Sequence, residues 1–525
     1  MVKKPNRARG LHQPGGRREF IQMPPTCSSD PIVSEGNSLD DIRKLAAGMG
    51  GIHLGRGSEG SVWTPNETSV LILGPPRSGK TSSMVIPAIL AAPSAVVSTS
   101  TKPDVMLATS HSRQRNGPCL LYDPSGTVAP SPGVQLVAWS PMDSCKSWDE
   151  ALVTTRGLSG SLSNHRDQGV GQHWRERAEA LLAPLLHAAA LDGVPMATVL
   201  SWVDRREVTS AIRILDREGA SIASDVATGI ATTDPREQSG IWSTASGVLA
   251  AYRSESALGS TLGPKFDPST FCSQGGTIYI CATGRHQELL APLVVGIIGS
   301  VRAAAYSCAA VESSNFPANR PPQTKALFAL DEVANIAPIP DLPAMVSEGG
   351  GQGVVTMACL QDLSQARARW GASADGFLSL FGTTVVLPGI ADVRTLEDLS
   401  LLAGEVEVNT RSVSSPLRRT SLWPTLRGGV RDGRSSVTTA PNMRRLLPVD
   451  AIARGMPGTA LLVDQRAQMG WITLTPWFRE EPWKSAVLAG QAEDRLAEKT
   501  VANRTEVLLA ADRDAMPAKA PDLGR

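Results

Sequence analysis

Short apolar runs alternate with helix-compatible stretches along most of the chain. Runs rich in Val, Ile and Leu that are bounded by Gly and Pro are typical of buried parallel strands. Such runs occur at Val70–Leu73, Ala95–Ser98, Cys119–Tyr122, Thr277–Ala282, Ala326–Leu330, Val354–Leu360 and Thr383–Leu387. Strands that alternate with helices predict a doubly wound α/β sheet, to which Ala460–Val463 and Trp471–Thr475 could add an edge hairpin.

The pattern changes between Ser147 and Ser260, where strand-like runs are scarce. Within this part, Trp174–Leu191 carries its apolar residues at helical spacing, so that they share one face. Those residues are Ala178, Leu181, Leu182, Leu185 and Leu186. We therefore expect a mostly helical, all-α insertion over residues 147–262, between two parts of the α/β domain at 46–146 and 263–483. Composition predicts a flexible basic arm over residues 1–45 and a charged tail over 484–525.

Composition bounds the class of protein. The 525 residues are 42% hydrophobic, which is enough for a sizeable core and excludes disorder throughout or a collagen-like chain. Lys plus Arg number 51 against 50 acidic residues, so any affinity for nucleic acid requires a local patch. The seven cysteines form no C-x-x-C pair, which argues against zinc and redox motifs and for buried free thiols. Leu181–Leu200 and Leu289–Val301 fall short of a membrane span, so we expect a soluble, cytoplasmic chain with no transmembrane segment.

One motif carries specific chemistry. Residues 74–81 read Gly-Pro-Pro-Arg-Ser-Gly-Lys-Thr, which fits G-x-x-x-x-G-K-[ST] between a predicted strand and a predicted helix. The two glycines let backbone N–H groups approach phosphate oxygens, Lys80 can reach the β- and γ-phosphates, and the Thr81 hydroxyl suits Mg²⁺. We predict a site for ATP and Mg²⁺, although no base-reading motif separates ATP from GTP. Its predicted cofactor-binding residues are Gly74, Arg77, Ser78, Gly79, Lys80, Thr81 and Ser82.

An acid pair follows a later apolar strand. Ala326–Leu330 is succeeded by Asp331 and Glu332, which a parallel strand would deliver to the edge where the phosphate loop lies. We predict that Asp331 binds Mg²⁺ together with Thr81, and that Glu332 polarises the attacking water. The alternative makes Asp331 a helix N-cap and Glu332 a first-turn partner of the helix dipole.

The next strand, Val354–Leu360, ends at Gln361. A polar residue at this strand tip can sense the γ-phosphate, so Gln361 is predicted to be catalytic together with Lys80 and Glu332. Alternatively, Gln361 only precedes a helix that begins near Leu363 and is capped by Asp362. The glycine-rich residues 349–353 predict a mobile loop before this strand.

A basic segment is the candidate nucleic-acid contact. Residues 411–445 contain eight arginines against one acidic residue, Asp432, and Trp423 could stack on a base. The predicted nucleic-acid-binding residues are Arg411, Arg418, Arg419, Arg427, Arg431 and Arg434. One of these arginines could instead serve as a finger that reaches a neighbouring subunit's phosphate, and a solvated basic loop is the remaining alternative.

Several of these motifs together resemble the TraG/TraD/VirD-type coupling proteins of conjugative type IV secretion. The resemblance covers roughly residues 60–480 and rests on four stretches. They are Leu73-Gly74-Pro75-Pro76-Arg77-Ser78-Gly79-Lys80-Thr81 with Val85-Ile86-Pro87, Asp331-Glu332, Gln361-Asp362-Leu363-Ser364-Gln365 with Arg367, Trp370 and Gly371, and Gly382-Thr383-Thr384-Val385-Val386-Leu387-Pro388-Gly389. The combination is much more specific than the phosphate loop alone.

The resemblance implies a fold, an assembly and a set of partners. It implies a RecA-like P-loop NTPase sheet with an all-α insertion, assembled as a homohexamer that brings DNA in its relaxosome, with the relaxase, to a type IV secretion channel. The chain departs from the family where many members have an Asp-Pro-Lys-Gly-Glu-like sequence, because residues 100–104 read Ser-Thr-Lys-Pro-Asp. Family members also usually begin with membrane-spanning helices, and none is expected here. Either a separate membrane-anchoring partner recruits this chain to the inner face of the cell membrane, or the chain is a truncated family member.

The sequence leaves three functions to distinguish. The first is an ATP-hydrolysing coupling protein that recruits and translocates DNA. The second is an FtsK/HerA-like DNA translocase with the same motor core but another task. The third is a substrate-recruiting adaptor in which nucleotide controls assembly and turnover is small.

Overall fold

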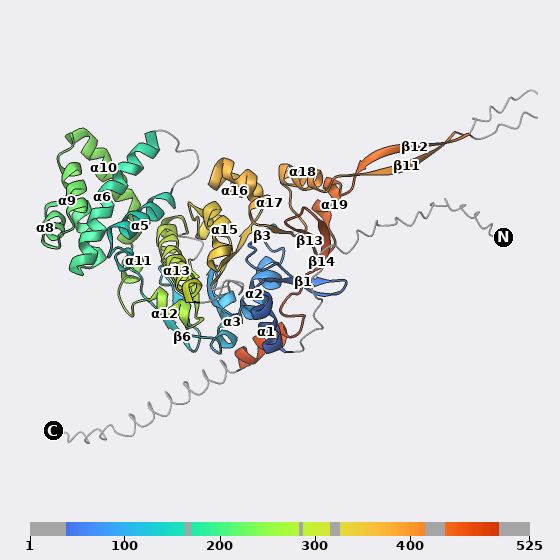
Figure 1. The fold of residues 1–525 in the computed structure, drawn as a ribbon, viewed down its shortest axis with the longest axis horizontal. Coiled ribbons are helices and arrows are strands. Elements are labelled where there is room, and N and C mark those ends of the chain that lie inside the picture. Colours follow the sequence, from blue (N-terminus) through green and yellow to red (C-terminus); the bar gives the residue numbers. More distant parts are fainter. Residues whose placement is uncertain (1–37, 163–169, 283–286, 316–325, 415–435, 493–525) are drawn as a thin grey trace, which may run out of the picture.

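A twelve-stranded sheet forms the centre of the molecule (Figure 1). The computed structural model describes residues 38–162, 170–282, 287–315, 326–414 and 436–492. The strand order is β2-β1-β14-β13-β10-β3-β9-β8-β4-β7-β5-β6, and the strands from β10 to β6 are parallel. The strands are β1 (His53–Gly57), β2 (Gly60–Trp63), β3 (Val70–Leu73), β4 (Ala95–Ser100), β5 (Cys119–Tyr122), β6 (Val134–Leu136), β7 (Thr277–Cys281), β8 (Ala326–Leu330), β9 (Val354–Leu360), β10 (Thr383–Val386), β13 (Thr459–Val463) and β14 (Met469–Thr473).

The parallel part of the sheet confirms the predicted fold class. Each of the seven apolar runs forms one of these strands, and all residues of β3, β4, β5, β7, β8, β9 and β10 are buried. The predicted hairpin β13–β14 is also present, but it does not form the edge, because β1 and β2 extend the sheet beyond it. These two strands are short, glycine-containing and only partly buried, so they lack the apolar run that marks a core strand.

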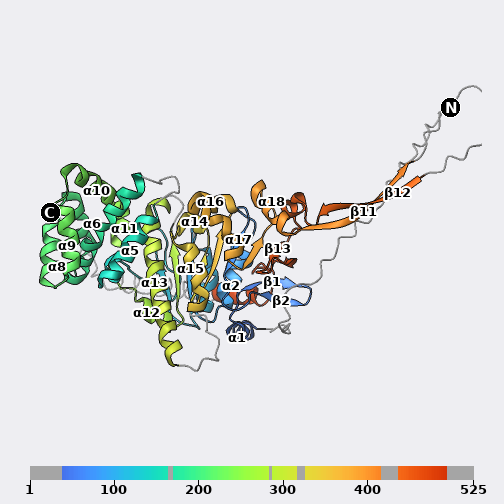
Figure 2. The same ribbon diagram turned by 45° about the horizontal axis from the view of Figure 1, so that its top comes forward.

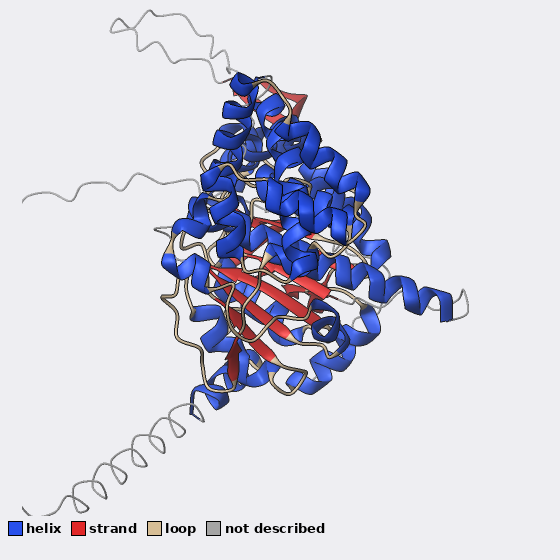
Figure 3. Cartoon of the chain, turned by 90° about the vertical axis from the view of Figure 1, so that its left-hand side faces the viewer, coloured by secondary structure: helices blue, strands red, loops and turns tan. Residues whose placement is uncertain are grey.

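Helices cover both faces of the sheet (Figure 3). On one face, α1 (Leu39–Met49), α2 (Ile86–Ala91) and α3 (Asp104–Arg113) share a hydrophobic core with residues of β3, β4 and β9. On the other face, α13 (Gln287–Asn315) and α15 (Leu342–Gly349) belong to a second core that continues into the helical part of the chain. The sheet therefore separates two apolar layers, as expected for a doubly wound fold.

The described residues between β6 and β7 form helices. The buried face predicted for Trp174–Leu191 is present in α6 (Val170–Asp192), where Leu181, Leu182 and Leu185 are inaccessible to solvent. This helical group lies at the opposite end of the molecule from the β11–β12 ribbon (Figures 1 and 2). The helices are α4 (Pro141–Ser144), α5 (Trp148–Gly160), α6, α7 (Met196–Arg205), α8 (Thr209–Arg217), α9 (Ser221–Ala231), α10 (Pro235–Val248), α11 (Glu255–Gly259) and α12 (Pro268–Ser273), with a 3-10 turn at Ala250–Arg253.

Helix α13 is longer than its apolar run suggested. The stretch Gln287–Val311 has a mean hydropathy of 1.7 and the length and composition of a membrane span. The prediction that the apolar run Leu289–Val301 is too short to cross a membrane is therefore wrong, because the apolar helix is longer than that run. Within the fold, 61% of the most apolar part of this stretch is buried, and mostly buried core helices also have this length and composition. Leu293 and Ile297 of α13 are fully buried in the core against the sheet.

Two predicted loops contain regular structure. The flanks of the arginine-rich segment form an antiparallel ribbon of β11 (Glu405–Ser414) and β12 (Ser436–Arg445), which extends from the body (Figure 2). The glycine-rich residues 349–353 end α15 and continue as a 3-10 turn, Gly350–Gln352, before Gly353 adopts a positive φ. The remaining helices are α14 (Val333–Ile336), α16 (Leu363–Trp370), α17 (Phe377–Leu380), α18 (Val393–Leu402) and α19 (Val449–Arg454), with a 3-10 turn at Gly371–Gly376.

Candidate nucleotide-binding site

The phosphate loop connects β3 to a short π-helix, η1 (Thr81–Val85), that continues into α2. The loop bends tightly, since Arg77 and Gly79 have φ angles of 65° and 96°. Its first glycine is also closely packed, because a Cβ at Gly74 would lie 2.8 Å from Ser78 Oγ and 3.0 Å from Leu387 Cβ. The backbone thus turns tightly at the carboxyl end of β3, as in loops whose N–H groups surround a phosphate.

Two polar side chains lie inside this loop. Lys80 is only 9% exposed, and its ammonium donates to the carbonyl oxygens of Gly74 and, at 3.0 Å, of Pro75. An ammonium has three donors, so one further N–H can be offered to a phosphate oxygen. The buried Ser78 hydroxyl has no hydrogen-bond partner among the described residues. Both observations fit a loop whose polar groups are completed by an anionic ligand.

Thr81 and Asp331 meet although 250 positions separate them in the sequence. The Thr81 hydroxyl donates to Asp331 Oδ2 across 2.6 Å. Asp331 directly follows β8, two strands from β3, and its main-chain oxygen accepts a hydrogen bond from Thr99 Oγ1 on β4 at 3.1 Å. The structure therefore brings together the two side chains for which the sequence predicted a shared magnesium ion.

The charge environment of Asp331 matches that of a cation ligand. The carboxyl is 7% exposed, and burial raises its pKa above the usual value. The Thr81 hydrogen bond and the positive charge of Lys80 oppose this shift, while the neighbouring Glu332 adds to it. A divalent cation would stabilise the ionised form of such a buried carboxylate, because the cation compensates for the lost hydration.

Glu332 has a backbone conformation that is rare for its residue type. Its φ and ψ are 49° and 46°, in the left-handed region, where it occupies the N-cap position of α14. Its side chain makes no capping hydrogen bond, and it is partly exposed. The alternative placed Asp331 at the N-cap of this helix and Glu332 in its first turn. It is wrong, because Glu332 itself occupies the N-cap position. Strain of this kind is typical of functional sites, which agrees with a catalytic part for Glu332.

Gln361 directly follows β9, the strand next to β8, which the acid pair follows. Its main-chain N–H donates to Gln365 Oε1 at 3.0 Å, and Gln365 Nε2 donates to Asn335 Oδ1 at 3.3 Å. Asn335 N in turn donates to the Glu332 carbonyl at 2.9 Å. Helix α16 begins after Asp362, whose carboxylate caps it as predicted. The sequence did not single out Asn335 or Gln365, although Gln365 belongs to one of the motifs quoted above.

The structure describes only a small part of the predicted nucleic-acid contact. Arg418, Arg419, Arg427, Arg431 and Arg434 lie outside the described residues, as does Trp423. The backbone of Arg411 lies in β11, where it pairs with Thr439. Arg444 and Arg445 are exposed on β12, opposite Val406 and Glu405.

A magnesium ion fits the donors that this site supplies. Among the described residues, no cluster of three or more His, Cys, Asp or Glu side chains is arranged to hold a metal ion. Mg²⁺ prefers few protein ligands together with waters and phosphate oxygens, so one carboxylate and one hydroxyl are the expected set. Thr81 and Asp331 provide that set at the mouth of the phosphate loop.

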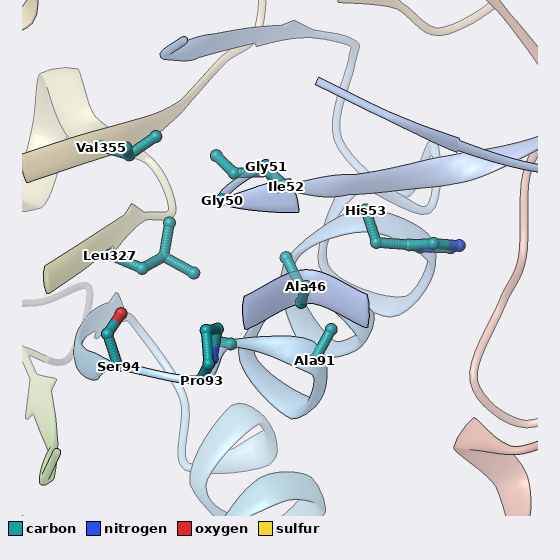
Figure 4. Close-up of a pocket in the computed structure, with 12 residues that line it drawn as sticks. Ala46, Gly50, Gly51, Ile52, His53, Ala91, Pro93, Ser94, Leu327 and Val355 are labelled. Atoms are coloured by element: carbon teal, nitrogen blue, oxygen red, sulfur yellow. The ribbon is translucent and has the colours of Figure 1, made fainter. Parts of the chain in front are cut away.

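Two cavities lie away from the phosphate loop. One of about 20 Å³, with room for about one water molecule, lies at the amino-terminal edge of the sheet, between α1, β1 and the start of β8 (Figure 4). The other, of about 240 Å³, lies between α5, α13 and α15 and is lined in part by Glu150, Arg302 and Tyr306. Neither lining includes a residue of the phosphate loop.

Sequence comparisons agree with these features. A family model described as the TraM recognition site of TraD and TraG matches residues 325–457. Two conjugal transfer proteins TraG from Escherichia coli are each 25% identical, over 421 and 423 residues, which is 74% and 75% of this chain. The chain spans 62% and 63% of the length of these two relatives.

Solved structures show the same fold. The bacterial conjugative coupling protein TrwBdeltaN70, in an unbound form, superimposes with a TM-score of 0.60 at 16% identity, covering 83% of this chain and 91% of that one. The plasmid coupling protein TrwB in complex with ADP and Mg²⁺ has a TM-score of 0.57 at 17% identity, covering 78% and 86%. A complex of TrwB with a GTP analogue has a TM-score of 0.58 at 16% identity, covering 83% and 92%. Residues 325–457 thus match the family model of TraD and TraG, and the chain is similar in sequence to TraG proteins and in fold to TrwB.

Proposed function

We propose that this chain is an ATP-hydrolysing coupling protein that recruits DNA in its relaxosome and translocates it to a type IV secretion channel. The observation that carries the proposal is the hydrogen bond between Thr81 and Asp331. It unites the phosphate loop after β3 with the acid pair after β8, which is the arrangement that a magnesium-dependent phosphoryl transfer requires. Relatives named conjugal transfer and coupling proteins support the biological setting.

Each site residue has a distinct part in this proposal. The N–H groups of residues 77–82 and the Lys80 ammonium hold the phosphates, and Thr81 with Asp331 holds Mg²⁺. The cation, when bound, neutralises charge that develops on the phosphate oxygens. The Glu332 carboxylate accepts a hydrogen bond from the attacking water and thereby orients it. Gln361, on the neighbouring strand, reports whether the γ-phosphate is present.

The partners follow from the family and from the charge of the ribbon. The matched family model describes recognition of TraM, so we assign contact with a relaxosome protein, and through it the relaxase, to residues 325–457. The exposed Arg444 and Arg445 place positive charge on the projecting ribbon, which suits contact with DNA phosphates. A homohexamer recruited to the inner face of the cell membrane by an anchoring partner completes the proposal.

Magnesium-dependent ATP hydrolysis by the purified full chain, with and without DNA, tests the motor. Lys80→Ala is expected to abolish nucleotide binding. Glu332→Gln should keep binding while turnover falls by about 100-fold or more, as is usual for loss of a catalytic base. Glu397→Gln, which neutralises an exposed carboxylate on α18, is the matched control and should hydrolyse ATP normally. Unchanged turnover in both Lys80→Ala and Glu332→Gln would refute the mechanism.

Transfer of a mobilisable plasmid in a deletion strain tests the biological role. The unaltered chain should restore transfer, and Glu332→Gln should not. If the purified chain hydrolyses ATP but plasmid transfer is the same with and without the chain, the FtsK/HerA-like translocase is favoured. Transfer that persists in Glu332→Gln would favour the adaptor, in which nucleotide is bound but hardly turned over.

A further inference from the structure

The sequence gives no base-reading motif, but the structure places an aromatic segment against the phosphate loop. Trp477 N donates to the carbonyl oxygen of Ser82 at 3.0 Å, and Ser82 directly follows the magnesium ligand Thr81. This contact joins the segment after β14 to the first turn of η1. Segment Pro476–Arg479 is thus fixed beside the residues that bind the phosphates.

The strand order indicates which end of a nucleotide this segment meets. Asp331 and Glu332 follow β8 and Gln361 follows β9, so the groups that act on the γ-phosphate lie on one side of β3. β14 lies on the other side of β3, beyond β10 and β13. A triphosphate whose γ end points toward the acid pair therefore has its nucleoside end on the side from which Trp477 approaches.

The side chains of this segment have the chemistry of a stacking surface. Phe478 is 46% exposed, and its ring lies edge-on to that of Trp477, with 5.7 Å between centroids and 88° between planes. The Arg479 guanidinium carbon lies over the Phe478 ring, 5.7 Å from its centroid. Trp477 is partly buried against the core that contains η1 and α2, so its edge-on contact fixes the position of the Phe478 ring. An exposed ring that is held by a second ring and has a cation over one face suits stacking of a planar, electron-rich heterocycle.

We propose that Phe478, supported by Trp477 and flanked by Arg479, forms the platform on which the purine base of the bound nucleotide stacks. The proposal rests on the proposed function of the phosphate loop and adds the base contact. Stacking uses the face of the base and reads no donor or acceptor, so ATP and GTP should bind with similar strength. Complexes of the related TrwB with both a GTP and an ATP analogue are consistent with a site that tolerates either base.

Binding of ATP, GTP and inorganic tripolyphosphate to the full chain, each with Mg²⁺, separates the platform from the loop. Phe478→Ala should weaken binding of both nucleotides by roughly 5-fold or more, the range for loss of one stacked base, and leave tripolyphosphate affinity unchanged. Phe478→Tyr keeps the ring and should bind nucleotides as the parent does. Leu488→Ala, which truncates another apolar side chain of equal 46% exposure, is the control and should change neither affinity.

The outcomes distinguish a wrong platform from a wrong site. Unchanged ATP and GTP affinity in Phe478→Ala would overturn the platform. A loss of tripolyphosphate affinity equal to the loss of nucleotide affinity would also overturn it, because it would show that the substitution disturbs the phosphate loop. Loss for one base only would contradict a stacking contact. Failure of the unaltered chain to bind both ATP and tripolyphosphate would instead refute the proposed function of the phosphate loop.

Discussion

Gln365 Nε2 donates to Asn335 Oδ1 across 3.3 Å, which joins the segment after β8 to the segment after β9. The same two residues reach the proposed catalytic groups through the backbone. Asn335 N donates to the carbonyl of Glu332, and Gln365 Oε1 accepts from the N–H of Gln361. Glu332, the proposed water-orienting acid, and Gln361, the proposed phosphate sensor, are therefore joined by one continuous series of hydrogen bonds.

We expect this bridge to position groups rather than bind nucleotide. Gln365→Ala should lower kcat by about 30-fold, the effect of two lost hydrogen bonds of about 1 kcal/mol each, with little change in nucleotide Kd. Gln365→Glu keeps the acceptor for Gln361 N but loses the donor to Asn335, so its kcat should fall less than that of Gln365→Ala. In a double-mutant cycle with Asn335→Ala, the combined loss should be less than the product of the two single effects. Independent effects, or a Kd that changes in step with kcat, would contradict the bridge.

Asp331→Asn should separate folding stability from metal binding. Burial raises the pKa of Asp331, so its ionised form costs stability as pH rises through the folded-state pKa, and a neutral amide removes that cost. The variant should have a higher Tm than the parent near pH 7 in the absence of nucleotide. It should also lose the additional rise in Tm that Mg²⁺ gives in the presence of ATP. A fall in Tm without ligand would show that the carboxylate stabilises the fold.

His53 should make the fold sensitive to acid. Its ring is buried between Trp63 and Trp483, with centroids 5.2 Å and 5.1 Å away, and burial lowers its pKa to about 3. The unfolded chain takes up this proton near pH 6.5, so stability should fall as pH drops from about 6.5 toward 3, by at most about 1.4 kcal/mol per pH unit. In His53→Phe, thermal midpoints measured between pH 7 and 4 should decline less steeply.

The matched control is His173→Phe, which removes an exposed imidazole and should keep the parent's pH dependence. Equal slopes for the parent, His53→Phe and His173→Phe would contradict a buried, neutral His53.

Gly74→Ala should damage the phosphate loop by contact alone. The added Cβ would lie 2.8 Å from Ser78 Oγ and 3.0 Å from Leu387 Cβ, so the loop must shift, at a cost of about 1–3 kcal/mol. We expect tripolyphosphate and ATP affinity to fall together. Gly376→Ala is the control, because a Cβ there meets nothing within 4 Å and the φ of −87° suits alanine. Normal nucleotide binding by Gly74→Ala would mean that the loop is looser than its packing indicates.

The sequence predicted seven of the eight parallel strands because burial on both faces requires continuous apolar runs, and all seven runs form strands. It missed β6, of whose three residues two are exposed. The phosphate loop and the acid pair were predicted because their chemistry fixes residue types at short spacing. The adjacency of Thr81 and Asp331 needed only the rule that parallel strands end at one edge of a sheet.

Other features depend on contacts that no local pattern encodes. β1 and β2 pair with each other, and β1 also pairs with β14, although neither strand has a continuous apolar run. The left-handed conformation of Glu332 follows from its surroundings, since glutamate has no intrinsic preference for it. Asn335 and Trp477 belong to no recognisable motif, and their contacts with Gln365 and Ser82 come from tertiary packing.

The central position of β3 has a consequence for how the chain reaches its native state. Ser69 Oγ accepts from Thr356 N over a separation of 287 residues, and β10 follows still later in synthesis. On a ribosome, the early strand that carries the phosphate loop must wait for both of its partners. Such distant pairings slow folding and leave apolar strand edges open to aggregation, so production of this chain should benefit from slow expression and abundant chaperones.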